Sequence, residues 1–202
     1  MAPQLVLASR SPARLATLKA AGLAPLVVVS GVDEDAITAP DTTTLVARLA
    51  SAKAEAVAAG LDLDAELLIV GCDSLLEFEG EAHGKPADAA QARERWRRMR
   101  GRSGVLLTGH HVIAQLAGRR QSRTAVARTI VHFADLDDAE IDAYVATGEP
   151  VEVAGAFTID SLGGAYIRSI EGDPHTVVGI SLPLLRELFG ELGVPWHSLW
   201  QA

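Results

Sequence analysis

"LVLASRSPARLATLKAAG" (Leu5–Gly22) contains the succession of elements that decides the fold. The apolar run Gln4–Ala8 predicts a buried strand, and the segment from Pro12 to Ala21 predicts a helix that Gly22 ends. Ser11 suits the N-cap of this helix because its hydroxyl can accept from a free backbone N–H, and proline is tolerated in the first turn. A strand followed at once by a capped helix is typical of α/β proteins.

Strand-like and helix-like segments alternate along the rest of the chain. The apolar run "ELLIVGCDS" (Glu66–Ser74) predicts a buried strand that ends at Asp73. Further strands are predicted at residues 26–29, 104–116 and 123–133, a strand pair at 151–159 and 165–170, and helices at 41–59, 88–101, 136–148 and 181–192. This alternation predicts a layered α/β fold. The composition marks no domain boundary, and a split into lobes near residues 75–90 stays open.

The composition is that of an ordinary globular protein. Of the 202 residues, 49% are hydrophobic and 22% charged, and the net charge is −8. The single cysteine, Cys72, excludes an internal disulfide and a zinc site built from several cysteines. No signal-peptide pattern opens the chain, and no apolar run approaches the ~20 residues that cross a bilayer. We therefore predict a cytoplasmic protein with no membrane partner.

The turn after the first strand carries groups that suit an anion. The predicted helix start lies just beyond the carboxyl end of a strand, where α/β sheets bind ligands. Free N–H groups and the helix dipole favour negative charge there, and Arg14 can aim its planar guanidinium at the same place. The alternative is an ordinary capped helix with solvated arginines.

Lys53 interrupts the apolar stripe of the predicted helix at residues 41–59. Leu45, Leu49, Lys53 and Val57 follow one another at intervals of four, so they share one face of the helix. An ammonium group that faces the core needs a partner, and a carboxylate or a phosphate would serve. The alternative is a lysine at the edge of the stripe whose charged end reaches water.

Two acidic features suit a metal ion. Asp73 directly follows an apolar run, and a carboxylate at the end of a buried strand can hold a metal or deprotonate water. The segment "VDED" (Val32–Asp35) adds three carboxylates, which with Asp73 would form an oxygen-ligand site for Mg²⁺ or Mn²⁺. The alternatives are an aspartate that starts a turn and a solvated acidic loop.

Arginines crowd the predicted helix at residues 88–101 and surround most of its circumference. On a chain of negative net charge, such a helix more often presents a solvated face than a nucleic-acid site, so nucleic acid is not an expected partner. A local basic patch stays open. The arginines concerned are Arg93, Arg95, Arg97, Arg98, Arg100 and Arg102.

Several short motifs, in this order, together resemble the Maf family. They are "LASRSPAR", "DED", "RLASAKAEAV", "CDSLL", "GKP", "LTGHHV", "DAYVATGEP", "AGAFTID", "LGG" and "IEGDPHTVVGISLPLL". The resemblance runs from Leu5 to about Leu192. It implies a single domain over residues 1–202, with a mixed central sheet flanked by helices and two lobes that enclose a cleft, as in inosine-triphosphatase-like proteins. It also implies a homodimer that hydrolyses a nucleoside triphosphate to the monophosphate and pyrophosphate with a divalent cation, Mg²⁺ or Mn²⁺.

The resemblance further implies roles for individual residues. Asp73 matches the family's proton acceptor, and Glu34 matches an acidic residue near the metal, so both are predicted metal ligands. The positions that match phosphate-binding residues are Ser9, Arg14, Lys53 and Lys85.

The chain departs from the family pattern at positions associated with base choice. Ala13 stands where the family usually has a second arginine, Ser74 where it has threonine, and Asp160 where it has glutamine. A preference for dTTP or UTP is therefore not carried over. Asp160 can accept from an amino or imino group of a base, so a modified or different base is plausible, and we predict that Asp160 binds substrate.

The family's other name, septum-formation inhibitor, raises a second interpretation. The chain would then bind a nucleotide or a protein partner without turnover and regulate cell division. Retention of every charged position of the predicted site favours the enzyme.

Overall fold

The computed structural model describes residues 2–62 and 65–200. Its strands are β1 (Gln4–Leu7), β2 (Leu26–Val27), β3 (Leu67–Phe78), β4 (Glu81–His83), β5 (Ser103–Leu116), β6 (Arg119–Phe133) and β7 (Ile167–Glu171). Its α-helices are α1 (Pro12–Ala20), α2 (Thr42–Ala58), α3 (Ala89–Met99), α4 (Asp138–Ala146), α5 (Pro174–Val178) and α6 (Leu182–Glu191). Short 3₁₀ helices are η1 (Glu149–Glu152), η2 (Ala154–Ala156), η3 (Leu162–Tyr166) and η4 (Trp196–Leu199).

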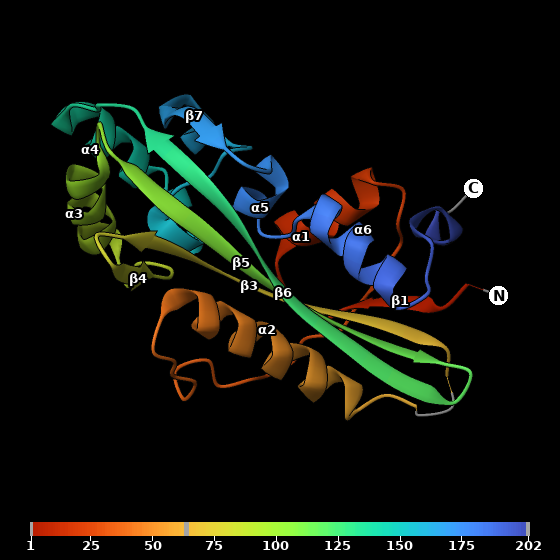
Figure 1. The fold of residues 1–202 in the computed structure, drawn as a ribbon. Coiled ribbons are helices and arrows are strands. Elements are labelled where there is room, and N and C mark those ends of the chain that lie inside the picture. The colour runs from red at the N-terminus through yellow and green to blue at the C-terminus, as the bar shows by residue number, and fades with distance from the viewer. Residues whose placement is uncertain (1, 63–64, 201–202) are drawn as a thin grey trace. The chain divides into compact units, whose positions relative to one another are not determined.

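The seven strands form a mixed sheet (Figure 1). The order is β2-β1-β3-β5-β6-β7, and β4 pairs with β3. Strand β1 is parallel to β2 and to β3, whereas the pairs β3–β4 and β6–β7 are antiparallel. The predicted α/β class with a mixed central sheet is therefore confirmed.

The chain forms two compact units, each assembled from separated segments. The first unit contains Met1–Asp73, Thr108–Ala127 and Gly179–Ala202, and the second contains Ser74–Leu107 and Arg128–Val178. One boundary, between Asp73 and Ser74, lies beside the region where a split was left open. The cleft between lobes and the single domain stay predictions.

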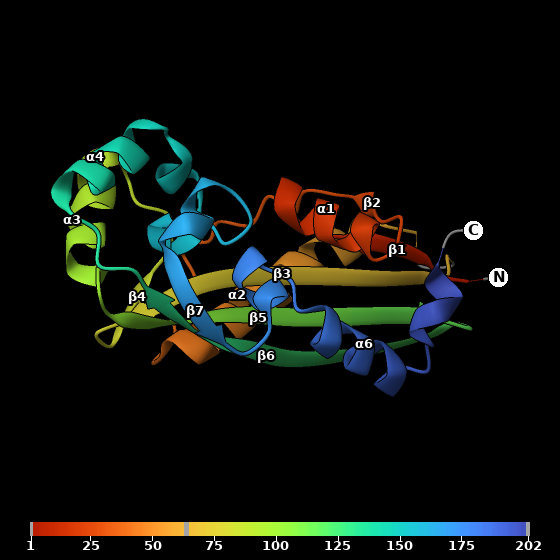
Figure 2. The ribbon, with the colours of Figure 1, turned by 90° about the horizontal axis from the view of Figure 1, so that it is seen from above.

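Alternation along β1 and β3 decides which side chains face which helix in the first unit. Within this unit, Figures 1 and 2 show α2 on one face of the strands and α1 and α6 on the other. Leu68, Val70 and Cys72 join the core with α1 and α6, and Ile69 joins the core with α2. Because side chains of a strand alternate, Asp73 shares the α2 face with Ile69.

Two glycines allow α2 to lie very close to the strands. A Cβ atom on Gly71 of β3 would lie 2.2 Å from the carbonyl oxygen of Ala50, and one on Gly109 of β5 would lie 2.2 Å from that of Val46. Both distances are far shorter than a van der Waals contact, so only glycine fits at these positions. This close approach places Lys53 of α2 against the strand that carries Asp73.

An aromatic cluster forms the core of the second unit. Trp96 of α3 makes edge contacts with Phe133, Tyr144 and Tyr166 at centroid distances of 5.6, 5.6 and 6.0 Å. Its indole N–H donates to the carbonyl of Ala156 at 2.8 Å, which satisfies the polar atom of a buried ring. Helices α3 and α4 lie side by side in both views (Figures 1 and 2).

Two predicted elements are wrong. Strand β3 does not end at Asp73 but continues to Phe78, because the carboxylate is accommodated by a lysine and needs no turn. The segment 151–159 forms η1, η2 and irregular chain instead of a strand. Within this segment, Gly155 and Ala156 have positive φ, at 75° and 67°, which a regular strand does not accept. Strand β7 exists, but its partner is β6.

Candidate active site

A lysine between two carboxylates is the centre of the charged cluster in the first unit. The ammonium nitrogen of Lys53 lies 2.5 Å from Oδ1 of Asp73 and 2.9 Å from Oε1 of Glu34. Lys53 and Asp73 are each only 7% exposed, whereas Glu34 is exposed. The predicted carboxylate partner of Lys53 is confirmed, and the alternative of a lysine that reaches water is wrong.

Burial and charge act in opposite directions on Asp73. Desolvation raises the pKa of its carboxyl above the usual 3.8, and the charges of Lys53 and Arg14 only partly oppose that effect. A buried carboxylate with a raised pKa is a stronger base than an exposed one. Such a group suits proton abstraction from water near neutral pH.

Arg14 ties the first turn of α1 to the strand that carries Asp73. Its Nη1 donates to the carbonyl of Cys72 at 2.9 Å and to Oγ of Ser9 at 3.1 Å, and its Nε donates to the carbonyl of Gly179 at 2.7 Å. The side chain is buried, so these donors compensate its desolvation. The alternative of a solvated arginine is wrong for Arg14, although Arg10 is exposed. Ser11 caps α1 as predicted.

The Ser9 hydroxyl is oriented by two donors. Its oxygen accepts from Nη1 of Arg14 at 3.1 Å and from the backbone N–H of Ser11 at 3.2 Å. A serine hydroxyl has two lone pairs and one proton. Because both lone pairs accept hydrogen bonds, the hydroxyl can still donate its proton, and a phosphate oxygen is a suitable acceptor.

The carboxylates of Asp73 and Glu34 fit a divalent cation in part. Both lie within 3 Å of one ammonium nitrogen, at 2.5 and 2.9 Å, so they already converge on one positive charge. In the described part of the chain, no three His, Cys, Asp or Glu side chains gather closely enough to hold an ion by themselves. Two carboxylates supply oxygen ligands of the kind that divalent cations prefer, but they do not complete a coordination shell by themselves. Asp33 and Asp35 are exposed, as expected of a solvated acidic loop.

Lys85 and Asp160 belong to the second unit. Lys85 is exposed, and its only described ion pair, with the exposed Glu152, is long at 3.8 Å. Its turn is nevertheless held firmly, because the carbonyl of Gly84 accepts from Arg95 at 2.6 Å and from the N–H of Gly155 at 3.1 Å. Asp160 is exposed at the tip of a loop. The substrate roles of both residues stay predictions.

Sequence reasoning missed Glu149, whose carboxylate accepts several hydrogen bonds in the second unit. Its Oε1 accepts from the Tyr144 hydroxyl at 2.8 Å, the Thr158 hydroxyl at 2.5 Å and the Gly163 N–H at 2.9 Å. Its Oε2 accepts from the Leu162 N–H at 3.2 Å. Desolvation alone would raise the pKa of Glu149, but hydrogen bonds from the side chains of Thr158 and Ser161, the N–H of Gly163 and the Tyr144 hydroxyl prevail and lower it to about 2. The motif "DAYVATGEP" contained Glu149 without revealing partners that come from later residues.

The arginines of α3 and of the turn that follows it form ion pairs with acidic side chains. Asp138 binds Arg97 at 3.1 Å and Arg100 at 2.8 Å, and Glu79 binds Arg98 at 2.6 Å and Arg102 at 2.7 Å. These ion pairs support the solvated face over a nucleic-acid site.

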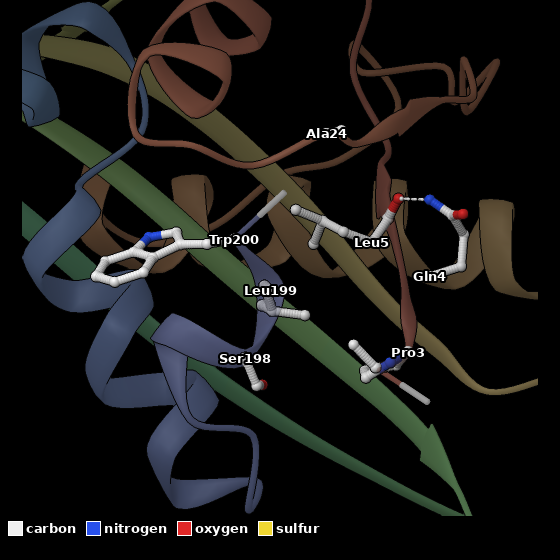
Figure 3. A pocket seen from close by; sticks show the side chains of 8 residues that line it. Pro3, Gln4, Leu5, Ala24, Ser198, Leu199 and Trp200 are labelled. Carbon is white, nitrogen blue, oxygen red and sulfur yellow. Dashed lines mark hydrogen bonds between the residues drawn. The ribbon is translucent and has the colours of Figure 1, made fainter. Parts of the chain in front are cut away.

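A pocket of about 220 Å³ in the first unit lies beside Pro3, Gln4 and Trp200 (Figure 3). Its lining holds no titratable side chain, so it offers no groups for catalysis. Within residues 2–62 and 65–200, none of the helices has the length and apolar character of a membrane span.

The mixed sheet and the buried lysine–carboxylate cluster define an α/β protein with a charged site. A sequence model of the family described as "Maf-like protein" matches residues 4–192, and the chain belongs to this family. A nucleoside triphosphate pyrophosphatase from Salinispora tropica is 57% identical over 199 residues, which cover 98% of this chain and 87% of that relative. Relatives with the same name are 51% identical in Cutibacterium acnes and 53% identical in Streptomyces coelicolor. These alignments cover 98% and 99% of the chain, and 94% and 98% of the relatives.

Proposed function

We propose that this chain hydrolyses a nucleoside triphosphate to the nucleoside monophosphate and pyrophosphate, with Asp73 as the proton acceptor. The observation that carries this proposal is the buried contact between Lys53 and Asp73, at 2.5 Å, with Glu34 on the same ammonium. The family and the name shared by relatives that are 51–57% identical supply the reaction class.

Asp73 would orient and deprotonate the water that attacks the α-phosphorus. Burial raises its pKa, so the carboxylate gains basicity, while Lys53 keeps it ionised. Arg14 holds the carbonyl of Cys72 and thereby fixes the backbone directly before Asp73. A base fixed in this way needs little reorganisation in the transition state.

The cationic and hydroxyl groups would bind the triphosphate. Lys53 can exchange one carboxylate for a phosphate oxygen, because its ammonium has three donors. The Ser9 hydroxyl would donate its proton to another phosphate oxygen, and the charge of Arg14 would favour the same anion. Lys85 would neutralise charge on the departing pyrophosphate.

Asp73 and Glu34 are the residues that would hold a divalent cation, and Mg²⁺ and Mn²⁺ are the proposed ions. A cation there would supply positive charge opposite the phosphate oxygens. Asp160 would accept from N–H groups of the base, which makes it the proposed determinant of nucleotide choice.

The test is product analysis with a panel of ordinary and modified nucleoside triphosphates in Mg²⁺ or Mn²⁺. We expect pyrophosphate and monophosphate, and we expect Asp73→Asn to slow their release by about 10²–10⁴ while nucleotide binding persists. Asp142→Asn, which removes an exposed carboxylate of α4, is the matched control and should keep full activity. Orthophosphate as the product, or equal activity in Asp73→Asn, would overturn the proposal.

The non-catalytic regulator of septum formation is not favoured, since the named relatives are enzymes. The homodimer and the cytoplasmic location remain predictions. Sedimentation of the purified chain tests the first, and cell fractionation tests the second.

A further inference from the structure

We propose that Glu149 is a positioning residue for nucleotide recognition, because its carboxylate clamps the loop Thr158–Gly163 that presents Asp160. The inference rests on the proposed function, since the loop matters to the reaction only if Asp160 reads a base.

The donors to Glu149 stand on both sides of Asp160. The Thr158 hydroxyl, two residues before it, donates at 2.5 Å, and the N–H groups of Leu162 and Gly163, two and three residues after it, donate at 3.2 and 2.9 Å. One carboxylate therefore joins both ends of a six-residue loop. Hydrogen bonds to an ionised acceptor are stronger than those between neutral groups, so the clamp restricts the loop more than a backbone turn would.

Gly163 makes the clamp possible by close approach. A Cβ atom at this position would lie 2.3 Å from the hydroxyl oxygen of Tyr144 and 2.7 Å from the backbone nitrogen of Thr158. Tyr144 is buried in the aromatic core, so its hydroxyl cannot retreat from an added methyl group. The loop is thus attached to the core of the second unit through Tyr144 and Glu149.

The ends of the loop are anchored while its tip is open. Gly163 and Phe157 are buried, whereas Asp160, Ser161 and Leu162 are exposed, Leu162 to 57%. The loop thus exposes a carboxylate, which can accept from N–H groups, and two residues later an aliphatic side chain, which offers an apolar surface for a ring. A nucleobase combines these two features, and the clamp keeps both at a fixed spacing.

The decisive experiment compares Glu149→Gln with Glu94→Gln, which changes an exposed glutamate of α3 in the same unit. Glutamine keeps the size of the side chain but replaces one acceptor oxygen with an NH₂ donor that faces other donors. For Glu149→Gln, we expect the ratio between the highest and the lowest kcat/KM among ATP, GTP, CTP, UTP and dTTP to shrink about tenfold, through changes in KM. The kcat for the best nucleotide should stay within about threefold of that of the unsubstituted chain. Glu94→Gln should match the unsubstituted chain.

A double-mutant cycle with Asp160→Asn separates positioning from a general loss of structure. If Glu149 acts through Asp160, Glu149→Gln should change selectivity less than about twofold in the Asp160→Asn background. An equal loss of selectivity in both backgrounds would overturn the inference, and so would an Asp160→Asn variant with unchanged selectivity. Should Glu149→Gln fail to fold, Thr158→Val removes a single donor and should shift selectivity in the same direction.

Hydrogen exchange distinguishes this inference from the proposed reaction. Glu149→Gln should speed exchange of the Leu162 and Gly163 amides at least tenfold, an effect that does not depend on turnover. Unchanged exchange would overturn the clamp even in an active enzyme. Absence of pyrophosphate release by the unsubstituted chain would instead overturn the proposed function.

Discussion

Asp73 and Glu149 are carboxylates whose surroundings shift their pKa values in opposite directions. Asp73 is 7% exposed, contacts one ammonium, and has a pKa raised by desolvation. Glu149 is less deeply buried, and its hydrogen-bond donors prevail over desolvation and lower its pKa to about 2. A raised pKa makes a carboxylate a useful base, whereas a lowered one keeps it an ionised acceptor over the whole neutral range.

The hydrogen-bond partners of the two carboxylates indicate which one can react with substrate and which one holds a loop in position. The partner of Asp73 is a flexible lysine side chain, which can move to a phosphate oxygen. The partners of Glu149 include two backbone N–H groups and a buried phenol, and burial together with that carboxylate raises the pKa of Tyr144. Such donors cannot leave without unfolding the loop. We therefore expect a reacting role for Asp73 and a fixed, structural role for Glu149.

The largest predicted difference is in kcat. Asp73→Asn should lower kcat by about 10²–10⁴, the usual contribution of a general base, with KM changed little. Glu149→Gln should keep kcat for the best nucleotide within about threefold of the value of the unsubstituted chain. Steady-state kinetics on both variants provide the measurement. A loss of kcat in Glu149→Gln as large as that in Asp73→Asn would abolish the distinction between the two carboxylates.

Removal of the Lys53 ammonium should lower the free energy of unfolding, because Asp73 would then be buried without its cation. Lys53→Met leaves two neighbouring carboxylates without their cation, which should cost about 3–5 kcal/mol in the free energy of unfolding. The pKa of Asp73 should rise further, because Lys53 is the strongest group that lowers it. Denaturant unfolding and the pH dependence of kcat measure the two effects. Lys19→Met, on the exposed end of α1, is the control and should change little.

Much of the first site was predictable because its signals are local. Lys53 stands out as a charge in a row of apolar residues four apart, and Asp73 as a carboxylate within an apolar strand. Ser11 and Pro12 mark a helix start in any fold. The continuation of β3 to Phe78 was not predictable from such signals, since it depends on a lysine from another segment that accommodates Asp73.

Glu149 could not be predicted from the sequence. Its donors belong to residues 144, 158, 161, 162 and 163, and the spacing of these positions follows no helical or strand period. The same region gave the wrong strand at 151–159, where valines favour a strand but the positive φ of Gly155 and Ala156 forbids it. In this part of the chain, tertiary hydrogen bonds decide the conformation.

Two glycines test whether close approach is required in both regions. Gly71→Ala should force the backbone of α2 away from β3, and Gly163→Ala should separate the loop from Tyr144. Each substitution should cost about 1–3 kcal/mol in the free energy of unfolding, the usual penalty for overpacking. Gly71→Ala should lower kcat, whereas Gly163→Ala should reduce nucleotide selectivity. Gly190→Ala in α6, which meets nothing within 4 Å, is the control, and stability equal to that of the control would contradict the requirement.

The smallest predicted effect is a change of the free energy of unfolding with pH that Glu149 causes. Its pKa is about 2 in the folded chain against an ordinary value of 4.5, so the unfolded chain binds more protons between these pH values. Its stabilisation is therefore complete above pH 4.5 and is lost as the pH falls towards 2. The unfolding free energy of the unsubstituted chain should exceed that of Glu149→Gln by about 2 kcal/mol at neutral pH, and this difference should shrink on acidification. Urea titrations at several pH values measure it, with Glu94→Gln as the control. A difference that stays constant from neutral pH to acid would mean that Glu149 stabilises the loop without its charge.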